Sequence, residues 1–347
     1  MRVKIIGAGS IGNHHAKACR TMGWDVDVVD SGLMALTRMR DEIYPQRYGK
    51  WDGLINLYDT NLQYRGGYDI IMIDTPPDVR MKLVFEALKE RPRLLHLEKP
   101  ICTPLLLKEP LPSFYADWHI QHPSCMVTVG YNHAVSKSIE KVIEIIKSGA
   151  IGKVITIDVE FREHWEGIFK AHPWLKGPED SYLWYWERGG GAGGEHSHAL
   201  HLWMYLAHIA NFGAVAKVKS VFDMVGNYDR VAAFVLKTSN GNVGRVVQDV
   251  VTKPPRKWAR IQGTKGFVEW VCNGWDNGLD GGDLVCWQTE ENCEHKLEII
   301  KTRQDDFLWL MQHYDNLLAG RAVYKDSPLH IDLGLEVMNI LYNAYKG

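Results

Sequence analysis

The first 130 residues alternate short apolar runs with helical patterns, and this alternation constrains the fold more than any other feature of the chain. The strand-like runs are residues 2–6, 25–30, 68–74, 93–98 and 125–130. Between them lie stretches such as 10–22 and 79–90, in which apolar side chains recur at helical spacing. Strands separated by helices predict a parallel sheet with crossover helices, so we expect a doubly wound α/β domain.

A glycine-rich turn, GAGSIG at residues 7–12, follows the first predicted strand directly. Its three glycines have the GxGxxG spacing, which allows a tight turn and a close approach of the backbone to a pyrophosphate. The helix that starts there offers unpaired N–H groups to the anion. We therefore predict a dinucleotide site that includes Gly7, Gly9, Ser10, Ile11 and Gly12.

Asp30 ends the second predicted strand, 18 residues after Gly12. A carboxylate at this position can accept hydrogen bonds from the ribose hydroxyls of the adenosine. It would also repel the 2′-phosphate of NADP, and neither Ser31 nor Gly32 supplies an arginine to neutralise that phosphate. The sequence thus favours NAD over NADP. Asp30 could also cap the next helix, and the two roles are compatible.

The pattern changes after Asn132, where we place a domain boundary. Most later strand-like runs follow one another with turn residues between some of them, which favours a largely antiparallel sheet; the runs are 153–161, 218–226, 230–238, 242–251, 258–263 and 266–271. Helical patterns cover 134–148, 304–318 and 331–345. We expect a Rossmann dinucleotide-binding domain at 1–131 and a second α/β domain at 132–347.

Charge and composition exclude several classes of partner. The formal net charge of −2 gives no electrostatic reason to expect nucleic acid or an anionic membrane. We see neither an apolar run of the length needed to span a membrane, about 18 residues, nor a signal peptide. The six cysteines form no CxxC pair. We therefore expect free thiols and a cytoplasmic protein.

The segment GGGAGGEHSHALH, residues 189–201, is compatible with a metal site, a proton-transfer site or a crowded helix entry. Glu195, His196, His198 and His201 are all able to bind a metal, but His196 and His198 are two residues apart and would tend to diverge. We expect no metal ion here. Histidine titrates near pH 6.5 and can accept a hydroxyl proton, and a carboxylate such as Glu195 can fix the histidine's tautomer. His196 and His201 could instead be hydrogen-bonded structural residues.

Several motifs resemble the glucose-fructose oxidoreductase, inositol dehydrogenase and rhizopine catabolism (Gfo/Idh/MocA) family. They are HLEKPI at 96–101, TPP at 75–77, GAGSIGNHHAKAC at 7–19, GYNHAVSKSIEKVIEIIKSGAIGKV at 130–154, RIQGTKGFVEW at 260–270 and the glycine-led segment. They occur in the family's order over nearly the whole chain. The resemblance implies a Rossmann domain and an α/β domain with a large open sheet that often mediates oligomers, here a homodimer or homotetramer.

The resemblance also implies NAD(P)-dependent redox chemistry at a carbohydrate carbon. Lys99 would touch the reacting hydroxyl, His198 would move its proton, and Glu195 would assist. The nucleotide pocket would extend to Thr75, Pro76, Glu98 and Lys99. The substrate would meet Lys99, Asn132, Trp165, His196 and His201.

Some positions depart from the family pattern. A frequent aspartate three residues after the catalytic histidine is His201 here, and a histidine often found after TPP is Arg80. Tryptophans and tyrosines are dense at 163–188, which suits a sugar ring but equally a core or an oligomer interface. We expect a sugar, sugar acid, cyclitol or nucleotide-sugar oxidoreductase. The alternatives are redox-assisted glycoside cleavage and a non-catalytic dinucleotide-sensing regulator.

Overall fold

The apolar runs at the start of the chain form a six-stranded parallel sheet with the order β3-β2-β1-β4-β5-β6. The computed structural model describes residues 1–105, 124–170, 172–272, 281–290 and 294–346. The strands are β1 Arg2–Ile6, β2 Asp25–Asp30, β3 Ile55–Asp59, β4 Ile70–Ile73, β5 Leu94–Leu97 and β6 Met126–Val129. The helices are α1 Ser10–Thr21, α2 Leu33–Arg38, the π-helix η1 Met39–Ile43, α3 Tyr44–Tyr48 and α4 Pro77–Lys89. The predicted parallel sheet is confirmed.

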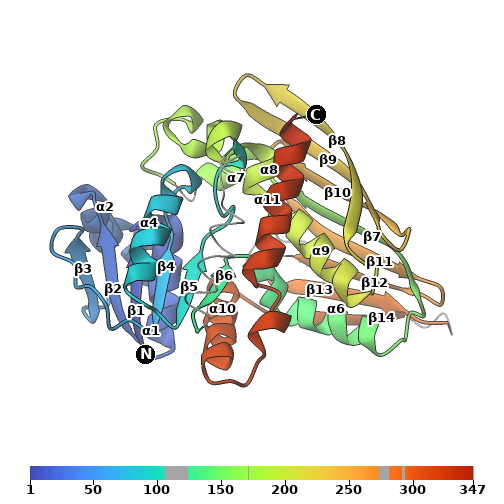
Figure 1. Cartoon of the computed structure of the whole chain (residues 1–347), viewed down its shortest axis with the longest axis horizontal. Helices are drawn as coiled ribbons and strands as arrows, with labels where there is room; N and C mark the ends of the chain where they lie inside the picture. Colours follow the sequence, from blue (N-terminus) through green and yellow to red (C-terminus); the bar gives the residue numbers. More distant parts are fainter. Residues whose placement is uncertain (106–123, 171, 273–280, 291–293, 347) are drawn as a thin grey trace.

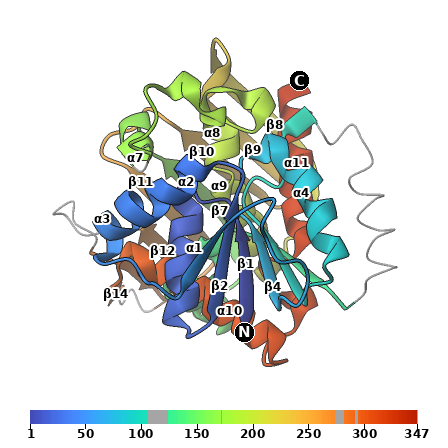
Figure 2. The same cartoon turned by 90° about the vertical axis from the view of Figure 1, so that its left-hand side faces the viewer.

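Helices cover both faces of this sheet. Figure 2 shows α1 on one side of the strands and α4 on the other. All four residues of β4, IIMI, are buried, without the alternation of a strand that has one face in water. A sheet buried on both faces needs such continuous apolar strands, and this is why the sequence pattern was easy to read.

The second sheet has eight strands in the order β14-β13-β12-β11-β7-β10-β9-β8. All neighbours are antiparallel except β7 and β10. The strands are β7 Val154–Arg162, β8 Val215–Val225, β9 Tyr228–Thr238, β10 Val243–Asp249, β11 Arg256–Gly263, β12 Phe267–Cys272, β13 Asp283–Gln288 and β14 Glu294–Ile299. The longer helices are α6 Lys137–Lys147, α9 His198–Ile209, α10 Arg303–Leu318 and α11 Ile331–Lys346. The short ones are η3 Asn132–Val135, α7 Trp165–Lys170, η4 Pro178–Asp180, η5 Tyr182–Trp184, η6 Trp186–Arg188, α8 Gly191–Glu195 and η7 Tyr324–Asp326.

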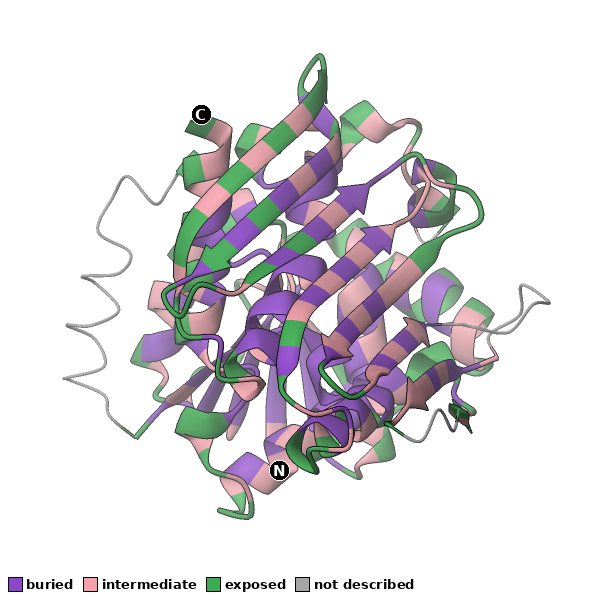
Figure 3. Cartoon of the chain, turned by 90° about the vertical axis from the view of Figure 1, so that its right-hand side faces the viewer, coloured by how far each residue is buried: buried purple, intermediate pink, exposed green. Residues whose placement is uncertain are grey.

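One face of the second sheet packs against helices, and the other is open. Helix α9 contacts β7 and β10, α6 contacts β12 and β13, and α11 contacts β8 (Figure 1). Figure 3 shows the opposite face, where buried and exposed residues alternate along the strands. Apolar side chains exposed on these strands include Ile155, Val221, Val235 and Val243. The predicted open, mostly antiparallel sheet is therefore confirmed.

The structure differs from the sequence prediction in a few elements. Strands β3, β13 and β14 and the helices between residues 33 and 48 were not predicted. The helix expected at 134–148 is divided into η3 and α6. The boundary after residue 131 falls between β6 and η3, and the division into domains there stays a prediction.

The five cysteines in the described part of the chain are free, and Cys293 lies outside it. Among the described helices, none is long and apolar enough to cross a membrane.

Candidate active site

The glycine turn after β1 has the shape that a pyrophosphate needs. Gly7 has φ +121°, and a Cβ there would lie 2.8 Å from the Asp74 carbonyl oxygen. A Cβ on Gly12 would lie 2.0 Å from the carbonyl oxygen of Gly7. Nothing lies within 4 Å of the corresponding point on Gly9, the N-cap of α1. Gly7 and Gly12 are therefore needed for the tight packing of the turn. Gly9 leaves space for a ligand at the helix N-terminus, where unpaired N–H groups are available.

Asp30 faces this turn from the end of β2. Its Oδ2 accepts from the Ala8 N–H and its Oδ1 from the Gly32 N–H, both at 2.8 Å. The carboxylate is fixed beside the glycine turn, where it can accept further hydrogen bonds. The N-cap residue of α2 is Gly32, and no side chain caps this helix, so Asp30 is not its N-cap as the alternative interpretation had it. Asp30 contacts the start of α2 only through the Gly32 N–H.

Arg47 of α3, which no motif singled out, contacts the first residue of α1. Its two terminal nitrogens donate to the carbonyl oxygen and the hydroxyl of Ser10, both at 2.8 Å. The guanidinium therefore adds positive charge next to the helix N-terminus. No sequence signal identifies it, because the contact depends on how the helices after β2 fold back onto α1.

Lys99, two residues after β5, meets Glu195 of the glycine-led segment. Its Nζ donates to the backbone oxygen and to Oε2 of Glu195, both at 2.9 Å. Their side chains are 11% and 19% exposed. The structure thus brings these two predicted residues together across 96 positions of sequence. The predicted partner was wrong, however: Glu195 pairs with Lys99, whereas we expected it to orient His198.

Glycine is needed where the glycine-led segment approaches the residues that follow β4 and β5. Gly189 has φ +93°, and a Cβ on it would lie 2.9 Å from Pro77 and 3.5 Å from Pro100. Next to it, Arg188 pairs with Asp78 of α4 at 2.7 Å. These contacts hold the glycine-led segment against the carboxyl edge of the first sheet, where ligands of doubly wound folds bind.

His198 is the first residue of α9, with Ser197 at the N-cap, as predicted. Its ring lies edge-on to Tyr131 and His133, with centroids 5.5 and 5.1 Å apart, and is stacked near Phe161. Burial, followed by the charges of His133 and Lys99, lowers the pKa of His198 well below its usual value. Its Nδ1 is buried without a hydrogen-bond partner. His198 is therefore a neutral imidazole with an unused ring nitrogen.

His196 lies beside a second lysine–carboxylate pair. Burial lowers its pKa to about 4, and its Nε2 has no hydrogen-bond partner. The nearby Glu163 pairs with Lys257 of β11 at 3.2 Å. Lys257 was not predicted, because nothing in its local sequence distinguishes it from a surface lysine.

The other predicted substrate contacts have different surroundings. His201 donates from Nε2 to the Pro328 carbonyl at 2.7 Å and stacks on Tyr131 at 4.0 Å. It is 1% exposed and its Nε2 is already paired, which favours the structural alternative; its contact with the substrate stays a prediction. Asn132 is buried with an unpaired Nδ2, and Trp165 packs among aromatic side chains with an unpaired indole N–H.

Arg80, a departure from the family pattern, joins the TPP and EKP segments. It is buried and donates to the carbonyl oxygens of Thr75, Glu98 and Pro100. The Glu98 carboxylate accepts a hydrogen bond from the Lys99 backbone N–H at 3.0 Å. Although burial opposes ionisation, His96, His15 and Lys99 lower the pKa of Glu98 to about 2. Pro76 is the N-cap residue of α4, and Gly7 packs against the backbone before Thr75.

Asp229 of β9 anchors the glycine-led segment from the side of the second sheet. Its Oδ2 accepts from the Gly193 N–H and its Oδ1 from the Tyr345 hydroxyl, both at 2.7 Å. Gln248 donates to the carbonyl oxygens of Ala192 and Gly193. Because burial raises the pKa of Asp229 to about 7, its charge state depends on pH near neutrality.

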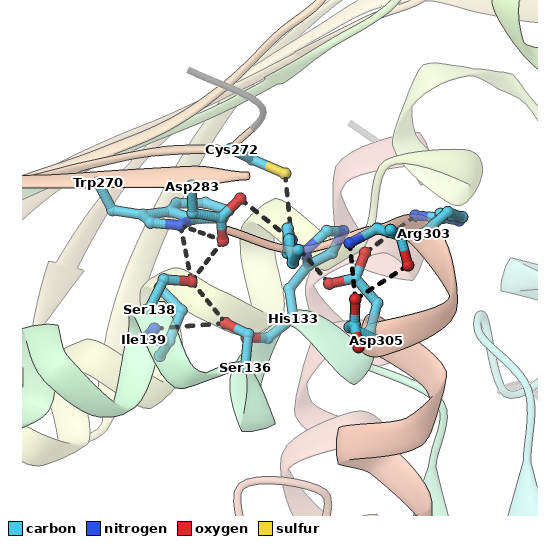
Figure 4. A network of polar contacts seen from close by, with 12 residues as sticks. His133, Ser136, Ser138, Ile139, Trp270, Cys272, Asp283, Arg303 and Asp305 are labelled. Carbon is cyan, nitrogen blue, oxygen red and sulfur yellow. Dashed lines mark hydrogen bonds and ion pairs between the residues drawn. The ribbon is translucent and has the colours of Figure 1, made fainter. Parts of the chain in front are cut away.

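A second buried network fixes the elements around His133 (Figure 4). Lys301 pairs with Asp283 of β13 at 3.0 Å and with Asp306 of α10 at 2.7 Å. Asp283 also accepts from the Ser138 hydroxyl and the Trp270 indole N–H. The network ties the starts of α6 and α10 to the second sheet and so holds the wall behind His198.

The chain resembles known oxidoreductases in structure. A dehydrogenase of levoglucosan in complex with NADH and levoglucosan is 15% identical, with a TM-score of 0.76 over 100% of this chain and 96% of the other. An oxidoreductase from Agrobacterium radiobacter in complex with NAD+, L-tartaric acid and magnesium is 19% identical, with a TM-score of 0.74 over 100% and 95%. GenD2 from gentamicin A biosynthesis, in complex with NAD, is 17% identical, with a TM-score of 0.69 over 100% and 93%. These similarities show the fold.

A search among curated proteins finds no match. The family model of the GFO/IDH/MocA C-terminal domain, in contrast, matches residues 139–269, which include the glycine-led segment and the strands β7 to β11. This match confirms, over residues 139–269, the resemblance seen in the motifs.

Proposed function

We propose that this protein is an NAD-dependent oxidoreductase that transfers a hydride between the nicotinamide and a carbohydrate hydroxyl or ketone. The observation that carries the proposal is the meeting of Lys99 with Glu195, next to His198, at the carboxyl edge of a Rossmann sheet. This edge is where doubly wound folds bind dinucleotides. The relatives described with NAD or NADH and with levoglucosan support the same chemistry.

The residues around the glycine turn fit NAD. Gly9 leaves space at the N-terminus of α1 for the pyrophosphate, with Arg47 beside it, and Asp30 is fixed where it would accept from ribose hydroxyls. Thr75, Pro76 and Glu98 would line the continuation of this pocket. When bound, NAD supplies the hydride acceptor. The carboxylate of Asp30 disfavours the extra phosphate of NADP.

Lys99 and His198 would handle the substrate hydroxyl. An ammonium group has three N–H donors, and Glu195 accepts from two of those of Lys99. The remaining donor would stabilise the oxygen as it becomes an alkoxide. His198 is neutral and has a free ring nitrogen, so it can accept the hydroxyl proton. Glu195 would hold the lysine in position.

A polyhydroxylated substrate would satisfy the polar atoms that remain unpaired near these groups. Within the described residues, Asn132 Nδ2, His133 Nδ1, His196 Nε2 and His198 Nδ1 are buried without a hydrogen-bond partner. Buried polar groups cost about 1–3 kcal/mol each when unpaired. Hydroxyl groups can both donate to and accept from such atoms, and for this reason we favour a sugar or cyclitol. Contact of the substrate with Trp165 stays a prediction.

We further propose that the open face of the second sheet forms a homodimer or homotetramer interface. The exposed apolar side chains on this face, among them Val221, Val235 and Val243, support the proposal because exposed apolar surface commonly marks an interface. The cytoplasmic location stays a prediction.

The decisive experiment is a screen of sugars, cyclitols, sugar acids and nucleotide sugars with NAD and NADP. We expect NADH to form with at least one of them and mass spectrometry to find a product that has lost two hydrogens. Release of an aglycone without net NADH would instead identify glycoside cleavage. Tight NAD binding without turnover of any sugar would indicate a dinucleotide-sensing regulator.

A further inference from the structure

Four side chains that can bind a metal meet inside the first domain, beneath the predicted nucleotide pocket. They are His15 of α1, Asp74 after β4, His96 of β5 and Glu98 after β5. The side chains of His15, Asp74 and His96 are fully buried, and that of Glu98 is 9% exposed. No step of the proposed hydride transfer uses this group of histidines and carboxylates.

The separations within this cluster suit ligands of one ion better than they suit hydrogen bonds. Glu98 Oε1 lies 3.9 Å from His15 Nε2 and 3.6 Å from His96 Nε2, and Asp74 Oδ1 lies 3.7 Å from His96 Nε2. Hydrogen bonds between such atoms would be about 2.7–3.2 Å long. Around a tetrahedral zinc ion with bonds of about 2.0–2.1 Å, neighbouring ligand atoms lie about 3.4 Å apart. The ligand atoms of His15, His96 and Glu98 all lie within 4.8 Å of one another, so these three side chains can approach one ion together.

The atoms that face one another are the ones that lack partners. His15 Nε2, His96 Nε2 and Asp74 Oδ1 are buried without a hydrogen bond. The other nitrogen of each ring is already held: His15 Nδ1 donates to Asp74 Oδ2 at 2.8 Å, and His96 Nδ1 is bonded to the Tyr314 hydroxyl at 2.5 Å. Metal-binding histidines are oriented in this way, by a carboxylate or another polar group on the second nitrogen.

The charge in the cluster also calls for a cation. Asp74 and Glu98 place two carboxylates in a buried space, and buried charges need compensation. The arginine and the lysine close to them have other partners in the described chain. Arg80 donates to three backbone carbonyls, and Lys99 pairs with Glu195. One divalent ion would balance both carboxylates while the two histidines stay neutral.

We propose that His15, His96 and Glu98 bind one zinc ion through two imidazole nitrogens and one carboxylate oxygen, with a water molecule as the fourth ligand. Asp74 holds His15 through the second ring nitrogen, as a carboxylate does for many metal-binding histidines. The ion is structural, because these side chains are buried and no step of the proposed hydride transfer uses them. It ties α1, which carries the phosphate loop, to the strand end that carries Lys99. The expectation that no metal is bound rested on the glycine-led segment, and this site lies elsewhere. The site does not depend on the redox function.

The test is metal content, measured on the full-length chain without a histidine tag. After incubation with Zn²⁺ and dialysis, elemental analysis should find about one zinc per chain. Replacement by Co²⁺ should give the intense visible absorption of a tetrahedral site, and X-ray absorption should show two imidazole ligands. His15→Gln and His96→Gln should each weaken zinc binding by a factor of at least about 10, the scale seen when the surroundings of a metal are disturbed. His208→Gln, an exposed histidine of α9, is the matched control and should bind as the wild type does.

A zinc content of less than about a tenth of an ion per wild-type chain would overturn the proposal. That result is expected if the cluster holds only water. Equal zinc retention in folded His15→Gln would overturn it too, because the metal would then be bound elsewhere. If neither variant folds, the wild-type spectra decide: an octahedral cobalt spectrum, or X-ray absorption without imidazole, contradicts the site. If the sugar screen finds no turnover, the proposed function fails, but the measured zinc content still tests the metal site.

Discussion

Replacing Lys99 by methionine is the sharpest test of the proposed chemistry. Methionine keeps most of the length of the side chain and removes the ammonium. In the structure, Glu195 accepts two of the three Lys99 donors, so one donor is left for the substrate oxygen within the described surroundings. Removing one donor to a developing oxyanion costs about 2.7–4 kcal/mol of transition-state stabilisation. At about 1.4 kcal/mol per factor of ten, kcat should fall by about 10² to 10³.

The assay follows NADH formation with the substrate found by the screen, and separates kcat from KM. The dissociation constant of NAD and the circular dichroism spectrum should change little, because most of the predicted nucleotide contacts, the glycine turn and Asp30 among them, stay in place. Glu195→Gln should cost less than about tenfold, since the backbone oxygen of residue 195 still accepts from Lys99. Lys253→Met, which breaks an exposed pair with Glu166, is the control and should leave kcat unchanged. A kcat of Lys99→Met within about threefold of the wild type would refute the role of this lysine.

Three further variants test other parts of the site. Asp30→Ala should weaken NAD more than NADP and shrink the preference by about 1–2 kcal/mol, as titration of both nucleotides would show; an unchanged ratio would exclude Asp30. His198→Gln should lower turnover by about 10² to 10⁴ with the fold intact, and the double variant with Lys99→Met should lose less than the product of the single losses. Asp229 has a raised pKa of about 7, so its protonated form favours the folded state and this stability is lost as the pH rises toward 7. Relative to Asp229→Asn, the wild type should gain about 2 kcal/mol of unfolding free energy between pH 7 and pH 5, measured by urea denaturation; equal slopes would contradict it.

The strands and the glycine turn could be predicted because their signals are local. Continuous apolar runs mark buried parallel strands, and the GxGxxG spacing marks a turn whose backbone geometry only glycine allows. Strand β14 was missed for the opposite reason. Strand β14, EHKLEI, lies at the edge of the second sheet and is mostly exposed, so charged residues replace the apolar alternation that identifies a strand.

The contacts within the site could be predicted only in part. The motifs identified Lys99, Glu195 and His198, but the partner of Glu195 depends on the approach of two segments 96 residues apart. His201 shows a related limit. It lies one turn after His198 on α9, and both rings contact Tyr131. His201, however, donates to the Pro328 carbonyl, whereas His198 keeps an unpaired ring nitrogen. Spacing along a helix does not tell which of two neighbouring histidines already has a partner in the protein.

The last residues of the described chain contribute to the packing around the first sheet, which the order of strands along the sequence does not reveal. Helix α10 packs against α1, the helix that begins at the glycine turn. Met311 of α10 lies 3.4 Å from Cys19 of α1, sulfur to sulfur, and the Tyr314 hydroxyl bonds to His96 of β5. Residues 1–131 therefore contain all six strands of the first sheet but only part of the core around them. Because α10 supports the outer side of α1, the position of the glycine turn depends on a segment that follows the second sheet.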